Sequence, residues 1–307
     1  MGVYRMYFYY AAYLYFLAAP VLLWLIVRRK GLWRYGAAAL LAPLSVLAYA
    51  RFVEPRILLA GRHDIALSRC FDKAGEFRLA VFSDTHIGIF GNEMPIGRIV
   101  RRVNAARPDL VFIAGDFAYL IEPARLDEAF APLARIAAPV YAVLGNHDIG
   151  EPAPDISAIL TPALEKLSVE IIDDKAISAR VAGDDIGIVG ISDLWGEHQK
   201  RALLDKPTDA PRLVLTHNPS LIRRLGESAK FDLMIAGHTH GGQIYLPFLT
   251  CRWQPGACDV TRYGLAETPR GPVFVTSGTG MVGLAMRFLV PPRIDVLTIR
   301  YNACAAG

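Results

Sequence analysis

The sequence predicts an α/β domain, a sandwich of two sheets flanked by helices, which follows an N-terminal transmembrane helix or helical hairpin. Three observations predict this arrangement. Residues 6–27 contain no charged side chain. Apolar runs of strand length then alternate with amphipathic helical patterns through the first half of the chain. Short apolar runs separated by Asp and Gly turns follow in the second half.

The first apolar segment, residues 6–27, is long enough to cross a hydrocarbon core of roughly 30 Å. A second segment, residues 35–50, reaches that length only if Arg34 and Arg51 extend outward to the interfaces. The alternative is a segment that lies in the membrane surface or packs on the domain. We expect residues 1–55 to form a membrane anchor of one or two helices.

Charge is unevenly distributed along the chain. Residues 1–73 carry ten Lys or Arg against three Asp or Glu, a net charge of +7, whereas residues 74–307 carry 23 against 26, a net charge of −3. The basic part is therefore membrane-proximal, which suits anionic lipid head groups. A nucleic-acid-binding protein concentrates its basic residues on the folded domain, so we expect no nucleic-acid partner.

The side of the membrane on which the domain lies is left open. Four basic residues crowd the loop between the apolar segments, Arg28, Arg29, Lys30 and Arg34. This cluster favours a cytoplasmic loop and an external domain, whereas five basic residues on the opposite side of the hairpin argue against that orientation: Arg5, Arg51, Arg56, Arg62 and Arg69. If the second segment does not span, the count favours a cytoplasmic domain. Cys251 and Cys258 form a loop disulfide if the domain faces an oxidising compartment, and unpaired thiols are the alternative.

Residues 56–76 are expected to be a linker and residues 77–307 the folded domain. In its first half the pattern predicts strands at 77–83, 109–114 and 140–144, an amphipathic helix around 96–103 and a helical stretch at 126–136. Three short runs then favour more antiparallel pairing, at 169–172, 177–181 and 186–191. Further strands are expected at 213–216, 233–236, 273–276 and 294–299.

Five of the seven histidines directly follow a predicted strand, where open α/β sheets place their ligands. Four of them belong to short strings that also include carboxylates and an amide: Ser-Asp-Thr-His at 83–86, Gly-Asn-His-Asp at 145–148 and Gly-His-Thr-His at 237–240, with Ala-Gly-Asp-Phe at 114–117. One such string is more often a turn or a cap, whereas the ordered set indicates a metal site. The remaining histidines, His63 and His198, are assigned no role.

The candidate metal ligands combine carboxylates, imidazoles and one amide: Asp84, His86, Asp116, Asn146, His217, His238 and His240. Such a set suits Mn, Fe or Zn and is too rich in nitrogen for calcium. Two cations roughly 3.5 to 4 Å apart need a shared carboxylate. We therefore expect two divalent metal ions as cofactors.

This ordered set resembles the calcineurin-like metallophosphoesterase superfamily over about residues 77–300. The resemblance implies one metal held by Asp84, His86 and His240. It implies a second metal held by Asn146, His217 and His238, with Asp116 bridging the two. His147 would contact the substrate together with Asn146 and protonate the leaving oxygen, while a metal-bridging hydroxide attacks phosphorus. Asp116 and His147 are thus the expected catalytic residues.

One position departs from the superfamily pattern. Members often carry an acidic residue three positions after the bridging aspartate, and it orients the substrate-facing histidine; this chain has Tyr119 there. Asp148 follows His147 directly, but adjacent side chains do not for that reason face each other. Because a phosphoanhydride leaves as a weakly basic phosphate and needs little protonation, Tyr119 favours pyrophosphate-type substrates.

Two loops are candidates for substrate recognition. Residues 248–271 carry Trp253, Arg252 and Arg262, and residues 281–293 combine four large apolar side chains with Arg287. An apolar wall beside an arginine suits an acyl chain attached to a phosphate, so Arg287 is a candidate substrate contact. The alternative is that these residues only close the core.

The string Gly-His-Thr-His-Gly-Gly-Gln-Ile at 237–244, the Gly-rich residues 277–283 and Pro291–Pro292 resemble a bacterial membrane-associated branch, similar to the UDP-2,3-diacylglucosamine hydrolases. The implied function is metal-dependent hydrolysis of a phosphodiester or pyrophosphate bond in a lipid-linked substrate at the bacterial cell (inner) membrane. Two alternatives stand beside it: a broad-specificity phosphoesterase acting on soluble phosphorylated substrates, and a non-catalytic membrane scaffold.

Overall fold

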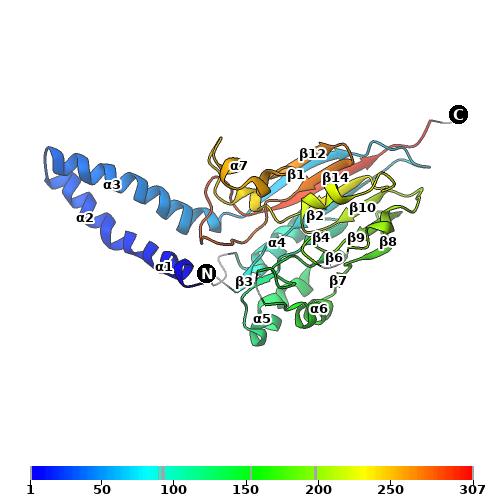
Figure 1. Ribbon diagram of the computed structural model, residues 1–307, viewed down its shortest axis with the longest axis horizontal. Coiled ribbons are helices and arrows are strands. Elements are labelled where there is room, and N and C mark those ends of the chain that lie inside the picture. The colour runs from blue at the N-terminus through cyan, green and yellow to red at the C-terminus, as the bar shows by residue number, and fades with distance from the viewer. Residues whose placement is uncertain (1, 89, 91–93, 153, 197–198, 306–307) are drawn as a thin grey trace.

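The computed structural model describes residues 2–88, 90, 94–152, 154–196 and 199–305. Figure 1 shows a helical hairpin that projects from one end of an α/β domain, and the C-terminus lies at the opposite end. The domain contains two six-stranded sheets that face each other, so the predicted two-sheet sandwich is confirmed.

The hairpin is formed by α1 (Gly2–Ala11), a 3₁₀ turn (Ala12–Leu14), α2 (Tyr15–Arg28) and α3 (Leu32–Ala48). The second arm continues through a π-helical turn, Tyr49–Val53, and a 3₁₀ turn, Glu54–Arg56. In the described part of the chain, two helical segments are long and apolar enough to cross a membrane, Tyr7–Arg28 and Leu32–Arg56. Their apolar side chains are mostly exposed, which indicates a surrounding other than a protein core.

The first sheet has the strand order β1-β14-β2-β4-β6-β7. Its strands are β1 (Leu59–Ala66), β14 (Arg293–Tyr301), β2 (Gly75–Phe82), β4 (Leu110–Ala114), β6 (Val140–Val143) and β7 (Val169–Ile171). Strands β2, β4, β6 and β7 are parallel. Three helices pack on the outer face: α4 (Ile96–Ala106), α5 (Leu126–Phe130) and α6 (Ser157–Glu165). The expected stretch 126–136 is thus α5 followed by a 3₁₀ helix, Ala131–Arg135.

The second sheet has the order β12-β13-β11-β10-β9-β8. Its strands are β12 (Gly264–Thr268), β13 (Gly271–Val275), β11 (Leu233–Ala236), β10 (Arg212–Leu215), β9 (Asp184–Gly190) and β8 (Lys175–Val181). Apolar side chains of both sheets interdigitate between them, among them Leu79, Phe112, Ile188, Leu215 and Phe274. Each of these side chains is removed from water, which makes this layer the main core of the domain.

The strand directions in the second half differ in part from those expected. Strands β8 and β9 are an antiparallel pair, as the short turn at Gly183 indicates. However, β7 joins the first sheet in parallel, and β9, β10, β11 and β13 are all parallel. The connections between these strands contain 3₁₀ helices, such as Arg201–Leu204 and Pro219–Arg224, and so are long enough to cross over.

The segment 56–76, expected as a linker, contains strand β1. This strand pairs in parallel with β14 over its whole length, from Leu59 opposite Arg293 to Ala66 opposite Arg300. It lies at the edge of the sheet, and among its eight residues only Ile65 is buried. An edge strand of this kind has little apolar alternation, which is why its sequence does not reveal it.

The pairing of β1 fixes where the hairpin meets the domain. Strand β14 is antiparallel to β2, and Asp295 near its start lies opposite Val81 near the end of β2. Since β1 runs parallel to β14, the start of β1 also lies at the carboxyl edge of β2. The hairpin, which ends three residues before β1, therefore leaves the domain at this edge (Figure 1).

The four cysteines form two disulfides. Cys251 pairs with Cys258, within the segment around the short helix α7 (Thr250–Trp253). Cys70 pairs with Cys304 and joins the segment after β1 to the segment after β14, which the sequence did not lead us to expect. Both pairs are typical of a domain that matures in an oxidising compartment.

Candidate metal centre

The predicted metal ligands all follow the carboxyl ends of strands. Asp84 and His86 follow β2, Asp116 follows β4, and Asn146 follows β6 in the first sheet. The others follow two parallel strands of the second sheet, His217 after β10 and His238 and His240 after β11. The structure brings all seven side chains together where the carboxyl edges of the two sheets meet. Parallel α/β sheets place their ligands at this edge.

Five of the seven residues hold their backbone in the left-handed region, which non-glycine residues rarely occupy. They are Asp84 (φ 53°), His86 (φ 43°), Asp116 (φ 55°), His238 (φ 68°) and His240 (φ 51°). Conformations of this kind cost free energy and persist where the surrounding structure enforces them, commonly at functional sites. The turns after the strands are therefore shaped to direct these side chains inward at a cost in stability.

One group of ligand atoms surrounds Asp84. Its Oδ1 lies 3.4 Å from Nε2 of His240, and the Nε2 atoms of His86 and His240 are 2.9 Å apart with nearly parallel rings. Ligand atoms of Asp84, His86, Asp116 and His240 all lie within 4.8 Å of one another. Since one atom of each side chain faces a common point, the group can hold one cation.

A second group surrounds His217. Its Nε2 is 3.2 Å from Oδ1 of Asn146 and 3.1 Å from Nδ1 of His238. Nδ1 of His217 lies 2.7 Å from the carbonyl oxygen of Ala114, a contact that orients the ring and leaves Nε2 directed inward. This group can hold another cation.

Asp116 lies between the two groups. Its Oδ2 is 3.4 Å from Nε2 of His86, in the first group, and 3.3 Å from Nε2 of His217, in the second. Its Oδ1 accepts a hydrogen bond of 2.9 Å from the backbone N–H of His147. A carboxylate in this position is shared by both groups, as a pair of closely spaced cations requires.

Burial controls the protonation of the first group. It raises the pKa of the Asp84 carboxyl to about 7, and the neighbouring Asp116 adds to this effect. It lowers the pKa of His86 to about 3, and it also lowers the pKa of His240. At neutral pH these imidazoles are uncharged, which is the form that binds metal ions.

In the second group, burial and the charge of Asp116 together control protonation. Burial lowers the pKa of His238 to about 3, and His217 adds to the lowering. Burial opposes the charged forms of Asp116 and His217 as well, but their attraction for each other outweighs it. As a result, the pKa of Asp116 lies below its usual range and that of His217 above it.

These properties fit divalent cations. Oδ1 of Asp84 is buried without a hydrogen-bond partner among the described residues, and the Nε2 atoms of His86 and His240 face each other. A cation between these groups would satisfy them and would keep Asp84 ionised. The donors are carboxylate, imidazole and amide, with no thiolate, so the set can hold Mn, Fe or Zn.

His147 lies beside the two groups and next to Tyr119. The ring centroids of His147 and Tyr119 are 4.3 Å apart, and those of His147 and His86 are 4.9 Å apart. The carboxylate of Asp148 accepts the backbone N–H groups of Gly145, Phe117 and Ala118. Asp148 therefore joins the loops after β4 and β6, and its contacts do not orient His147.

Arg287 occupies a different position from the substrate contact that the sequence led us to expect. Its side chain is fully buried, and its guanidinium donates to the carbonyl oxygens of Gly280, Ser277 and Val290. One of its nitrogens lies 3.5 Å from Nδ1 of His240. The arginine therefore packs behind a candidate ligand, where it supports the loop.

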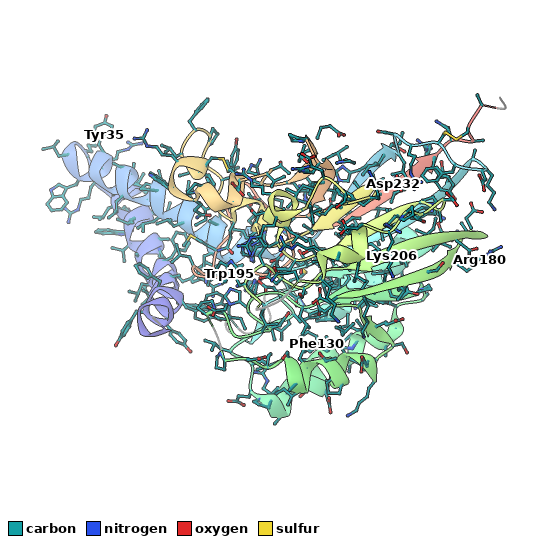
Figure 2. The ribbon with its side chains drawn as sticks, turned by 45° about the vertical axis from the view of Figure 1, so that its right-hand side comes forward. Tyr35, Phe130, Arg180, Trp195, Lys206 and Asp232 are labelled. Carbon is teal, nitrogen blue, oxygen red and sulfur yellow. A yellow bond between two sulfur atoms is a disulfide. The ribbon has the colours of Figure 1, made fainter. Side chains whose placement is uncertain are left out.

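The sequence analysis assigned no role to two side chains that lie near the centre. Trp195 packs against His238, with ring centroids 5.9 Å apart, and Figure 2 shows it at the hairpin end of the domain, opposite Arg180. Ser83 donates a hydrogen bond to the Asp84 carboxylate.

Two histidines lie outside the strings and were assigned no role. Nε2 of His63 lies 3.0 Å from Oδ1 of Asp295 and 3.0 Å from the hydroxyl oxygen of Tyr263. His198 lies outside the described residues.

Comparison with known proteins shows the family of the chain. A family model described as calcineurin-like phosphoesterase matches residues 77–242, more than half of the chain, and includes all seven candidate ligands. The chain therefore belongs to the calcineurin-like phosphoesterase family and is a metallophosphoesterase.

The chain is similar over most of its length to three bacterial proteins. It is 27% identical to metallophosphoesterase YkuE of Bacillus subtilis (88% of this chain, 96% of the relative). It is 27% identical to phosphodiesterase YaeI of Escherichia coli (90% and 100%). It is 24% identical to UDP-2,3-diacylglucosamine pyrophosphatase LpxG of Chlamydia trachomatis (86% and 95%).

The shared carboxylate can be displaced by one methyl group. A Cβ atom at Gly145 would overlap Oδ1 of Asp116 and lie 2.5 Å from the Asp116 backbone nitrogen. We expect Gly145→Ala to lower kcat/KM for a soluble phosphodiester by about a hundredfold, because a displacement of about 1 Å at a catalytic centre has this effect. The control, Gly187→Ala, places its Cβ no closer than 3.5 Å to any other residue and should retain activity. A fully active, folded Gly145→Ala variant would contradict the assigned place of Asp116.

Proposed function

We propose that the chain hydrolyses a phosphodiester or pyrophosphate bond in a lipid-linked substrate at the bacterial cell (inner) membrane. The observation that carries the hydrolytic part is the convergence of seven side chains that can act as metal ligands, from two sheets and with five of them on strained backbone. The lipid-linked part is supported by the hairpin, which leaves the domain at the edge where these side chains meet.

The proposed roles follow the two groups of atoms. Asp84, His86 and His240 hold one divalent cation. Asn146, His217 and His238 hold the other, and Asp116 is shared. When bound, such a pair would polarise the phosphoryl oxygens and activate a water molecule for attack on phosphorus.

The substrate-facing role belongs to His147 in this proposal. Its backbone N–H is fixed by Asp116 and its ring is packed against Tyr119, so the imidazole is oriented beside the shared carboxylate. Tyr119 offers no carboxylate that would stabilise a protonated His147. The site therefore suits a leaving group that needs little protonation, such as the phosphate released from a pyrophosphate.

One relative supports a lipid-linked substrate. This protein, with 24% identity, is named for the hydrolysis of UDP-2,3-diacylglucosamine, an acylated sugar joined through a pyrophosphate. That substrate joins both proposed features, an acyl anchor and a phosphoanhydride. It is therefore the first lipid-linked compound to assay.

Hydrolysis by the full chain in detergent tests the proposal. We expect cleavage of UDP-2,3-diacylglucosamine and, more slowly, of a simple alkyl phosphodiester, with loss of both on chelation and recovery with Mn or Zn. Asp116→Ala should lower both rates by at least about a hundredfold, since even changes around a metal ligand cost roughly 10 to 100-fold. Asp185→Ala, at an exposed carboxylate whose ion pair with Arg180 is also exposed, is the control.

Three outcomes would decide against parts of the proposal. Chelator-resistant hydrolysis with an active Asp116→Ala variant would contradict the metal centre. Cleavage of soluble esters alone would favour a broad-specificity phosphoesterase. A folded, metal-loaded protein without hydrolysis would favour a scaffold.

The catalytic domain is proposed to lie on the external side of the membrane. Two disulfides suit an oxidising compartment, and the tip of the hairpin carries Arg28 at the end of α2 and Arg29 and Lys30 in the loop before α3. An alkaline phosphatase reporter fused after Gly307 should therefore be active, because it folds only where disulfides form. Green fluorescent protein fused at the same place provides the opposite signal, because it is fluorescent in the cytoplasm and dark in the oxidising compartment. A fluorescent fusion together with an inactive phosphatase fusion would place the domain in the cytoplasm.

A further inference from the structure

An apolar cleft of about 340 Å³ lies where the hairpin meets the domain. The two arms of the hairpin form its walls, and the loop after Gly283 closes its inner end. Its lining includes Ala12, Ala18, Leu44, Ala48, Leu284 and Met286. Clefts of this size and composition accommodate small apolar ligands.

The position of the cleft specifies what can fill it. The walls belong to Tyr7–Arg28 and Leu32–Arg56, the two segments that are long and apolar enough to cross a membrane. The lining positions lie in the half of the hairpin next to the domain, away from the tip at Gly31, where Figure 2 shows Tyr35. In a bilayer, the apolar ligand present at this place is a lipid acyl chain, and its head group lies beside the domain.

Hydrogen bonds join the segment at the inner end of the cleft to the loop that carries His240. Three residues after this ligand, the side chain of Gln243 donates to the carbonyl oxygens of Val282 and Leu284, at 2.8 and 2.9 Å, and accepts from the backbone N–H of Val282 at 2.8 Å. Val282 lines a pocket together with His238 and His240, and Leu284 lines the cleft. The segment 282–284 therefore borders the metal centre on one side and the cleft on the other.

The loop that follows His86 reaches the same place. The ring of Phe90 stacks on Tyr9, with centroids 5.9 Å apart, and Tyr9 lines the cleft. Arg51 also lines the cleft, and its guanidinium lies 4.2 Å from the centroid of the Tyr9 ring. An otherwise apolar cleft that ends at a cation suits an amphiphile with an anionic group next to its acyl chain.

We infer that the cleft binds an acyl chain of the substrate lipid while the phosphoryl group of the same molecule lies at the metal centre. This inference rests on the proposed function and makes the hairpin part of the substrate site as well as an anchor. The segment 282–284 then separates the polar and apolar parts of the substrate. The specificity of the enzyme for lipid-linked substrates comes from the junction of hairpin and domain.

The test fills the cleft without touching the metal centre. Ala48→Trp places an indole in the cleft, and Val46→Trp places one on the same helix at a position that is 48% exposed and outside the cleft. The full-length variants are compared in phosphatidylcholine nanodiscs on one phosphodiester lipid with acyl chains of 4 and 16 carbons, and on soluble bis(p-nitrophenyl) phosphate. Melting temperatures check the fold.

We expect the wild-type chain to prefer the longer lipid by at least about tenfold in kcat/KM, the effect of roughly two buried methylene groups. Ala48→Trp should abolish this preference, and hydrolysis of the soluble diester reports whether the metal centre is intact in each variant. Val46→Trp should behave as the wild type. Equal rates on both chain lengths in the wild type, or equal behaviour of the two Trp variants, would overturn the inference.

Photo-cross-linking tests whether the cleft binds an acyl chain even if no lipid is hydrolysed. A phosphatidylglycerol with a photoreactive group on its acyl chain should cross-link to the peptides around Ala12–Ala18 and Leu284–Met286 in the wild type and in Val46→Trp, and not in Ala48→Trp. Cross-linking without lipid hydrolysis would mean that the cleft binds a lipid other than the substrate, which overturns the inferred substrate role. Hydrolysis of lipids without cross-linking in the cleft would contradict acyl-chain binding in the cleft, while the proposed function would stand.

Discussion

The structure depends on the burial of carboxylates and imidazoles at a single place between two sheets. Asp84 and Asp116 lie in water-excluded surroundings, where the uncharged imidazoles of His86 and His240 surround Asp84 and the imidazole of His217, whose pKa is raised, contacts Asp116. Buried charges cost free energy unless they are compensated, and the protein also holds several of these residues in left-handed conformations. A pair of divalent cations would offset both costs, and the strands, the turns after them and the core are arranged to bring the side chains that could hold such a pair together.

The apolar hairpin is connected to this centre through buried polar groups. Arg287 contacts the loop of His240 with its guanidinium, and its backbone N–H donates to the carbonyl oxygen of Ala50 at the end of the hairpin. Glu54 accepts a hydrogen bond from the backbone N–H of Val290, three residues further along the same loop. Because one loop contacts both parts, a movement of the hairpin relative to the domain would change the surroundings of His240. The hairpin and the candidate metal centre are therefore one structural unit.

The sequence predicted the parts of this structure that depend on local pattern. The central strands are buried apolar runs, and the candidate ligands follow them directly. Periodicity and spacing were therefore sufficient to predict strands β2 and β4 and to place Asp84, His86 and Asp116 after them. The predicted placement of the other ligands rests on the same logic. Strand β1 was missed because an edge strand is largely exposed, and the Cys70–Cys304 pair because its partners are 234 residues apart.

Arg287 shows a different limit of the sequence. A charged residue among apolar neighbours in a loop suggested a substrate contact, whereas the fold surrounds its guanidinium with carbonyl oxygens from Ser277 to Val290. Whether a charge faces a ligand or the backbone depends on how a loop closes, and no spacing in the sequence records this. The same holds for the cleft beside Leu284, which exists only because the hairpin and a distant loop meet.

The most direct test of the central claim is the metal content of the folded, full-length protein, measured by inductively coupled plasma mass spectrometry after removal of loosely bound ions. Two transition-metal ions per chain are predicted, since the two groups of ligands share Asp116. A folded protein that retains none under these conditions, even after incubation with Mn or Zn, would contradict the account.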